Sequence, residues 1–205
     1  MPRAPEDHRP LQANAPLVLA CRTAPGWLLL ALERFDEVLV DHAHCEKKAA
    51  SNALSLLQAY PEVPGLPAQM ARIAREESAH LARVLELLEA RGLPLTKDGG
   101  DPYARALQRL LRNPPLQRRL DRLLVAAVIE ARSCERLALL AGGLADPALR
   151  QFYDELAQSE DGHQALFFRF AVLAAGEPEA RSRLAELLEA EAHILSSLPL
   201  RVGIH

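Results

Sequence analysis

The stretch DPALRQFYDELAQSEDGHQALFFRFAVLAA (residues 146–175) decides the fold, because it contains the start, the period and the end of one long helix. Asp146 followed by Pro147 is an N-cap with a first-turn proline, and Gly176 follows the last residue. Its apolar residues recur every three or four positions, which is the spacing of one helix face. The residues at this spacing are Leu149, Phe152, Leu156, Glu160, His163, Phe167 and Phe170. An acid and an imidazole therefore interrupt an otherwise apolar stripe.

The composition of the whole chain also indicates a helical protein. Leu (39) and Ala (35) account for 74 of the 205 residues, whereas Val, Ile and Thr together supply 15. Leu and Ala are strong helix formers, while strands draw on β-branched and aromatic residues. The composition excludes a β-sandwich or barrel, and the length suits one domain that needs no disulfide to fold.

Prolines and glycines divide the chain into segments. We expect long helices over 25–60, 67–92, 116–141 and 147–175, a short helix over 103–112 and a last helix over 178–197. Residues 1–24 contain four prolines and are expected to form an extended arm, before a single domain over 25–198 and a tail over 199–205. The prediction is an all-α four-helix bundle with additional short and C-terminal helices.

The apolar stripes of the other three long helices are also interrupted by acids. Glu46 falls within the first stripe, and Glu130 falls within the third. The second stripe contains Glu77 and, one turn later, His80. Because a buried charge must be paired or must bind a metal ion, these residues are candidates for a site inside the bundle.

The spacing of these residues repeats along the chain. Glu46 precedes Glu77 by 31 residues, and Glu130 precedes Glu160 by 30. A carboxylate and an imidazole three positions apart lie on one helix face and can reach the same metal ion. Four carboxylates and two imidazoles suit two iron or manganese ions, as in the carboxylate-bridged sites of ferritin-like bundles. We expect Glu46 and Glu130 as terminal ligands, Glu77 and Glu160 as bridging ligands, and His80 and His163 as nitrogen ligands.

An alternative reading is that the four acids are buried but are satisfied by arginines or by one another. The stripes hold no matching arginines, which favours the metal site. His42 shares the stripe of Glu46 and is interpreted as a satisfied core histidine. Tyr153 is either a core residue or a redox-active tyrosine, and Glu135, about 140° round its helix from Glu130, is expected at the surface and not in contact with the site.

The net charge of the whole chain does not indicate nucleic-acid binding, but one arginine-rich segment is a candidate for it. The chain has 24 basic and 27 acidic residues, whereas the segment 103–122 contains six arginines and one acid. Such a run is either a solvated helix face or a surface that follows RNA phosphates. The six candidates for RNA contacts are Arg105, Arg109, Arg112, Arg118, Arg119 and Arg122.

The cysteines and the hydropathy pattern indicate the compartment. The three cysteines form no CxxC pair and fit a reducing environment. No window has the roughly 18 uninterrupted apolar residues that a membrane span needs. We expect a cytoplasmic protein with no membrane segment.

Four stretches resemble one enzyme family. They are DHAHCEKKAAS (41–51), EESAH (76–80), EARSCER (130–136) and SEDGH (159–163). They resemble the bacterial tRNA 2-methylthio-N6-isopentenyladenosine hydroxylases, and the likeness extends from about residue 17 to residue 200.

This resemblance implies a ferritin-like, non-haem di-iron monooxygenase that hydroxylates the isopentenyl chain of a modified adenosine beside the anticodon. It implies two iron ions as cofactor, with the six candidate ligands at the positions of the family's ligands, although manganese is also compatible with them. It further implies dioxygen as co-substrate, tRNA as partner through its anticodon loop, and an external reductase. We expect a monomer or a small oligomer.

Two other function classes share the six ligands. A ferritin-like or bacterioferritin-like storage protein would form a hollow shell, and the bacterioferritin type would also need a haem-ligating methionine. The only methionines are Met1 and Met70, which disfavours that type. Another di-iron oxidase, generating a radical or scavenging peroxide, is the second alternative.

Overall fold

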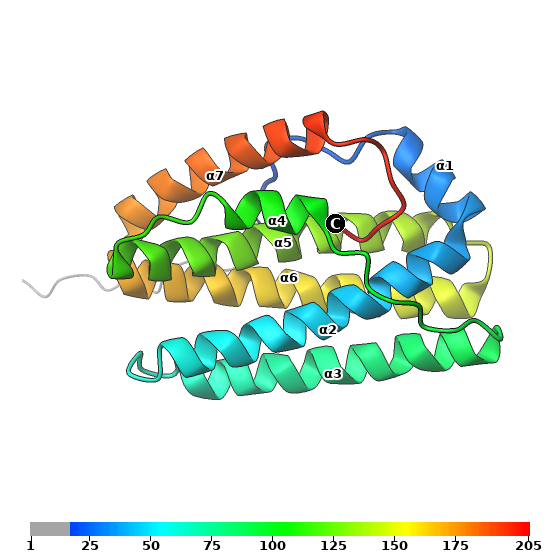
Figure 1. Cartoon of the computed structure of the whole chain (residues 1–205), viewed down its shortest axis with the longest axis horizontal. Helices are drawn as coiled ribbons and strands as arrows, with labels where there is room; N and C mark the ends of the chain where they lie inside the picture. Colours follow the sequence, from blue (N-terminus) through cyan, green and yellow to red (C-terminus); the bar gives the residue numbers. More distant parts are fainter. Residues whose placement is uncertain (1–16) are drawn as a thin grey trace, which may run out of the picture.

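The computed structural model describes residues 17–205, and within this range it contains seven helices and no strand (Figure 1). The all-α prediction is therefore confirmed. The helices are α1 (Gly26–Glu33), α2 (Phe35–Ala59), α3 (Leu66–Ala90), α4 (Pro102–Gln108), α5 (Pro115–Gly143), α6 (Pro147–Ala175) and α7 (Glu177–Ser197). Residues 17–24 contain no helix, and the rest of the expected arm lies outside the described residues. Among the helices of residues 17–205, none is both long and apolar enough to cross a membrane.

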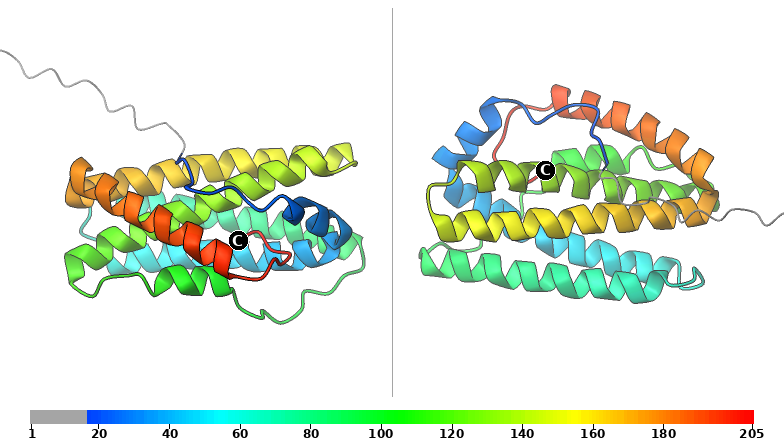
Figure 2. Two further views of the ribbon diagram at one scale, coloured as in Figure 1. Left: turned by 90° about the horizontal axis from the view of Figure 1, so that it is seen from above. Right: turned by 180° about the vertical axis from the view of Figure 1, so that it is seen from behind.

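Two helix pairs form the bundle. α2 packs against α3, and α5 packs against α6, each pair joined by a short connection (Figure 1). The connection between the pairs, residues 91–114, is long and contains α4. α7 lies over α4, α5 and α6, as the views from above and from behind also show (Figure 2). The repeated Glu…Glu-x-x-His pattern of the sequence thus corresponds to the two helix pairs.

Two of the expected helix boundaries are wrong. The single helix expected over 25–60 is divided at Arg34, which has non-helical angles (φ −117°, ψ 40°). The division lets α1 turn away from the axis of α2, so that Trp27 and Ala31 are fully buried and α1 contacts α5. The short helix ends at Gln108 instead of residue 112. The N–H groups of Leu110 and Leu111 bond the carbonyls three residues back instead of four, and the N–H of Arg112 donates to the carboxylate of Asp121 (2.8 Å).

The buried apolar residues form two clusters, with a polar layer between them. In α2, Leu39 belongs to one cluster and Ala53 to the other, and Glu46 lies between them. In α6, Leu156 and Phe167 are divided in the same way by the turns that carry Glu160. The six candidate ligands therefore occupy one level of the bundle.

A second buried polar group ties the outer helices to the bundle. Arg132 of α5 and Glu191 of α7 are both fully buried, and Nη2 of the arginine lies 2.8 Å from Oε1 of the glutamate. The hydroxyl of Tyr103 in α4 donates to the same oxygen (3.0 Å), and Arg132 also donates to Oγ1 of Thr23 (3.1 Å). These contacts hold α4, α7 and the segment before α1 against α5.

We expect Arg132→Leu to lower the free energy of unfolding by about 3 kcal/mol or more, because it leaves the Glu191 carboxylate buried without its partner. Urea denaturation measures the loss. Arg169→Leu, at an exposed position on α6, is the matched control and should change stability by no more than about 0.5 kcal/mol. Adding Glu191→Leu to Arg132→Leu should recover part of the loss. Equal stability of the single and double variants would show that packing, not an uncompensated charge, causes the effect.

Candidate metal centre

The six predicted ligands meet in the polar layer of the bundle. They form two groups, in each of which one ligand atom per residue lies within 4.8 Å of all the others. The first group is Glu46, Glu77, His80 and Glu160, and the second is Glu77, Glu130, Glu160 and His163. Glu77 and Glu160 belong to both groups, which is the placement expected of bridging carboxylates. The convergence agrees with the predicted ligand set, whose metal-binding role stays a prediction.

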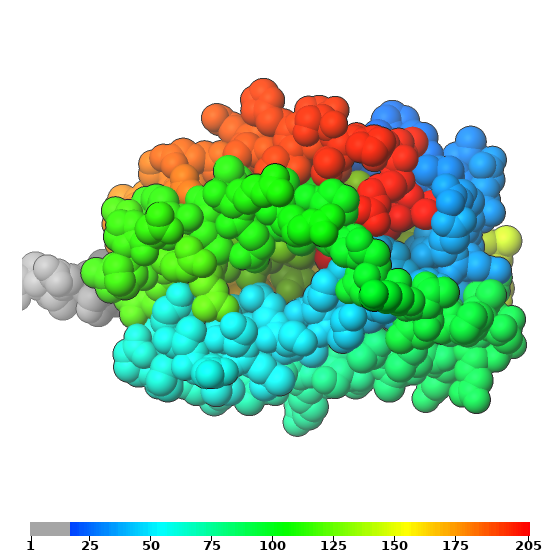
Figure 3. Space-filling view, in the orientation of Figure 1, coloured from blue at the N-terminus to red at the C-terminus, as the bar shows by residue number. Residues whose placement is uncertain are grey.

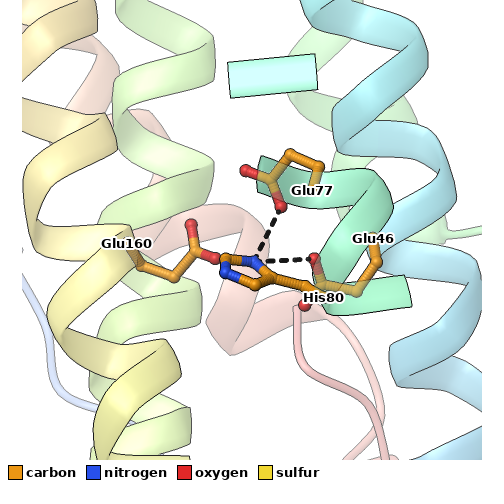
Figure 4. A group of neighbouring side chains, drawn as sticks. All are labelled: Glu46, Glu77, His80 and Glu160. Atoms are coloured by element: carbon orange, nitrogen blue, oxygen red, sulfur yellow. Dashed lines mark ion pairs between the residues drawn. The ribbon is translucent and has the colours of Figure 1, made fainter. Parts of the chain in front are cut away.

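Both imidazoles turn the same nitrogen toward the carboxylates. Nδ1 of His80 lies 3.6 Å from Oε2 of Glu46 and 3.4 Å from Oε2 of Glu77, and Figure 4 shows these side chains facing one another from α2 and α3. Nδ1 of His163 lies 2.8 Å from Oε1 of Glu77 and 3.4 Å from Oε2 of Glu160. The matching orientation gives each group one nitrogen donor.

Unsatisfied polar atoms collect at this level. Nine buried side-chain nitrogen or oxygen atoms in residues 17–205 lack a hydrogen-bond partner, and six of them belong to the two groups. The six are Oε2 of Glu46, both carboxylate oxygens of Glu77, Nδ1 of His80, Oε2 of Glu160 and Nδ1 of His163. Each such atom costs about 1–3 kcal/mol when it is left without a partner. A pair of divalent cations would satisfy all six, and oxygen and nitrogen donors of this kind suit iron or manganese.

Burial gives the carboxylates a high affinity for positive charge. It raises the pKa of Glu46 and of Glu130 well above the usual range, and neighbouring carboxylates raise both further. Burial disfavours the imidazolium forms of His80 and His163, but the adjacent glutamates outweigh it and raise the pKa to about 10 and about 11, respectively. Protons and metal ions therefore compete for these groups, and metal binding should release protons.

Two contacts position the ligands from outside the groups. Nε2 of His163 donates to Oε2 of Glu76 (3.1 Å), which fixes the ring with Nδ1 toward the site. Nε2 of His42 donates to Oε1 of Glu46 (2.7 Å), and the hydroxyl of Tyr153 lies 3.4 Å from Nδ1 of the same ring. His42 is fully buried, and burial lowers its pKa to about 4, so that the ring is neutral.

The interpretation of His42 as a satisfied core histidine is thus confirmed. Glu135 belongs to neither group, as expected, but the expected surface position is wrong, since its side chain is partly buried and accepts from Thr23 and Arg132. The role of Glu76 was missed by the sequence reasoning. Its one signal is its position directly before Glu77, and the contact with His163 depends on the distance between α3 and α6.

A cavity of about 210 Å³ leads from the carboxylates toward the surface. Figure 3 shows the surface hollowed between α2 and the α4–α5 region. Four of its lining residues are the carboxylates Glu46, Glu77, Glu130 and Glu160, and Ala126, Ile129 and Leu137 of α5 provide apolar lining. Polar side chains from α2, α4 and α5 also line it, namely Lys48, Asn52, Gln108 and Arg122.

The six arginines of the segment 103–122 fall into two kinds. Arg105, Arg109 and Arg118 are exposed. Arg119 donates to Glu62 (3.3 Å), and Arg122 donates to Ser55 (2.9 Å) and lines the cavity.

Arg112 belongs to a structural ion pair. Its Nη2 lies 2.7 Å from Oδ1 of the fully buried Asp121, and Nε of Arg183 lies 2.9 Å from the same oxygen. Burial opposes ionisation of Asp121, but these hydrogen bonds outweigh it and lower its pKa. The guanidinium of Arg112 is therefore already used within the chain.

We expect the purified chain to bind two metal ions and the double variant His80→Ala/His163→Ala to bind fewer, because each group loses its nitrogen ligand. Elemental analysis after loading with Fe²⁺ under anaerobic conditions gives the stoichiometry. Glu86→Gln, at an exposed position on α3, is the control and should keep both ions. Thermal unfolding should show stabilisation of the wild type by the metal, about 2.7 kcal/mol at a free concentration 100 times Kd. Two ions with an unchanged absorption spectrum in the double variant would contradict the ligand assignment.

Comparisons with known proteins agree on one family. The model of the family tRNA-(MS[2]IO[6]A)-hydroxylase (MiaE) matches residues 11–205. The tRNA 2-(methylsulfanyl)-N(6)-isopentenyladenosine(37) hydroxylase of Pseudomonas putida is 42% identical over 153 residues, which cover 75% of this chain and 74% of the relative. The protein of the same name from Salmonella typhimurium is 27% identical, over 91% of this chain and 89% of its own length.

A solved structure supports the fold. It is a Synechococcus protein described as having aldehyde deformylating oxygenase activity, with a TM-score of 0.86 and 40% identity over 91% of this chain and 94% of that one. The predicted ferritin-like bundle is therefore confirmed. Together with the match over nearly the whole chain, this shows that the protein belongs to the MiaE family of tRNA hydroxylases.

Proposed function

We propose that the protein hydroxylates the isopentenyl group of 2-methylthio-N6-isopentenyladenosine in tRNA, with dioxygen as co-substrate and two iron ions held by the six predicted ligands. The observation that carries the proposal is the pair of groups that share Glu77 and Glu160, both of which line the cavity. The family membership and the names of both hydroxylase relatives support the reaction.

The chemistry divides between the metal ions and the chain. When bound, the iron ions supply the means to activate dioxygen for insertion of one oxygen atom into an unactivated C–H bond. The reaction consumes dioxygen, two electrons and two protons, and it yields the alcohol and water. The two electrons come from outside the substrate, so the proposal includes an external electron donor.

The cavity suits a flipped-out base with an alkyl substituent. The apolar lining from Ala126, Ile129 and Leu137 would contact the isopentenyl chain near the carboxylates and exclude water from it. The adenine would lie nearer the surface, where Asn52 and Gln108 can exchange hydrogen bonds with its polar edge. The chain's own contribution is therefore to hold the metal ions, orient the alkyl group and exclude water from the site.

The exposed arginines beside the cavity are proposed to contact tRNA phosphates. Arg105 lies on α4, Arg109 directly follows that helix, and Arg118 lies in the first turn of α5; α4 and α5 both contribute to the cavity wall. Arg122, which lines the cavity, can contribute there, and Arg119 pairs with Glu62, whereas Arg112 is excluded as a primary contact by its pairing with Asp121. Anticodon loops are recognised through their phosphates and unstacked bases. Here the arginines would contact the phosphates, and the cavity would accept an unstacked base. We further propose that the protein acts in the cytoplasm as a monomer or small oligomer.

Mass spectrometry of tRNA nucleosides is the direct test. Cells with the active gene should contain the hydroxylated nucleoside, and cells without it should accumulate the unhydroxylated form. Purified iron-loaded protein with a chemical reductant should restore the hydroxylated product on that tRNA. Incubation with an aldehyde under the same conditions tests the activity described for the Synechococcus relative. Conversion of the aldehyde without any change in the tRNA nucleosides would contradict the proposed function.

The triple variant Arg105→Gln/Arg109→Gln/Arg118→Gln should bind tRNA more weakly, because it loses up to three phosphate contacts. The slope of log Kobs against log salt should become shallower by about 2. Anisotropy titrations of metal-free protein measure both quantities without turnover. The control carries Arg75→Gln, Arg150→Gln and Arg169→Gln, at exposed positions on α3 and α6. If both triple variants showed the same slope, the arginine surface would not be the binding face.

A further inference from the structure

Residues 202–205, which were expected to belong to a tail, pack into the molecule as part of the cavity wall. Ile204 is buried, and both Ile204 and His205 line the cavity together with Glu46 and Glu130. The C label in Figure 1 marks this end of the chain in the middle of the bundle and not at its edge. The segment therefore helps to set the size of the cavity beside the carboxylates.

Hydrogen bonds at two successive residues, Gly203 and Ile204, fix this segment. Nη1 of the buried Arg136 donates to the carbonyl oxygen of Gly203 (3.1 Å), and the N–H of Ile204 donates to Oδ2 of Asp41 (2.9 Å). A Cβ atom at position 203 would lie 3.1 Å from that same carboxylate oxygen, which favours glycine there. The position of the next residue, His205, is thus set by α2 and α5.

Asp101 holds the imidazole of His205 and also starts α4. Its Oδ1 accepts from the N–H groups of Tyr103 and Ala104, and its Oδ2 lies 2.8 Å from Nδ1 of His205. Burial opposes ionisation of Asp101, but the contacts with His205 and the helix outweigh it and lower its pKa. The His205 ring also stacks on Tyr103, with 6.3 Å between centroids and 25° between planes.

The same ring faces α2 beside the metal-ligand position. Nδ1 of His205 lies 3.7 Å from the thiol sulfur of Cys45, the residue before Glu46, and both Cys45 and His205 line the cavity. The imidazole therefore lies between α2 and the start of α4. Removal of the ring would enlarge the cavity on this side.

We propose that His205, fixed by Asp101, is a positioning residue that sets the room left for the alkyl substituent of the substrate and so determines which substituents the site accepts. It acts through the shape of the cavity and does not touch the reacting carbon. The identity of the substituent rests on the proposed function, whereas the role of His205 as a wall does not.

The wall is tested by the reactivity of Cys45 in metal-free protein. Methyl methanethiosulfonate is the probe, and peptide mass spectrometry follows the modification of Cys45, with Cys134 as internal reference. His205→Ala should make Cys45 react several-fold faster and leave Cys134 unchanged. His205→Gln, which keeps a donor for Asp101, should remain close to wild type, as should His193→Ala at an exposed position on α7. An unchanged Cys45 rate in His205→Ala, or equal acceleration of Cys45 and Cys134, would overturn the proposal.

Specificity is tested with anticodon stem-loop RNAs that carry either N6-isopentenyl or N6-benzyl adenosine. The benzyl RNA serves as a competitive inhibitor of hydroxylation, and its Ki relative to the KM of the isopentenyl RNA should fall about tenfold in His205→Ala. The ratio should not change in His205→Gln or His193→Ala. A faster Cys45 reaction with an unchanged ratio would overturn the specificity role. Failure of the wild type to hydroxylate any tRNA would instead overturn the proposed function, and the Cys45 experiment would still decide whether His205 is a wall.

Discussion

Four carboxylates inside a helical bundle are the constraint on which the rest of this structure depends. Each of the four long helices contributes one of them, and all are buried at one level. Such a set is too costly to leave unpaired in a core, and the raised pKa of Glu46 and Glu130 expresses that cost as an affinity for positive charge. The helix pairs must keep a common register to hold the set together.

The surroundings of the four carboxylates differ from one side to another: hydrogen bonds support them on some sides, and a cavity adjoins them on another. Glu76 fixes the ring of His163, while the neutral His42 donates to Glu46 and leaves the other oxygen of that carboxylate for the site. Tyr153 lies behind His42 and completes its hydrogen bonding. On the side of α4 the site opens into the cavity instead. Rigid support and open access are thus on different faces of the same polar layer.

The periodic features of the chain could be predicted from the sequence. The long helices follow from Leu and Ala at helical spacing, and the six site residues follow from the rule that charges rarely occupy core positions. The break at Arg34 could not be predicted, because no proline or glycine marks it and it depends on the packing of Trp27 against other helices. The contact of Arg183 with Asp121 could not be predicted either, since the two residues are 62 positions apart in the sequence. Contacts between segments far apart in the chain leave no local pattern.

The division of the core into two apolar clusters separates changes in apolar packing from changes in the polar layer between them. Helices α4 and α7 belong to the packing at one end, whereas α1 and Ile204 belong to the other. Because the two clusters are separate sets of contacts, a substitution in one does not change the direct side-chain contacts of the other. The cavity draws its walls from both ends, while the level of the six candidate ligands lies between them. During divergence, the cavity wall can therefore change while the carboxylate and histidine layer stays the same, which gives a physical reason why relatives with this bundle carry names for different reactions.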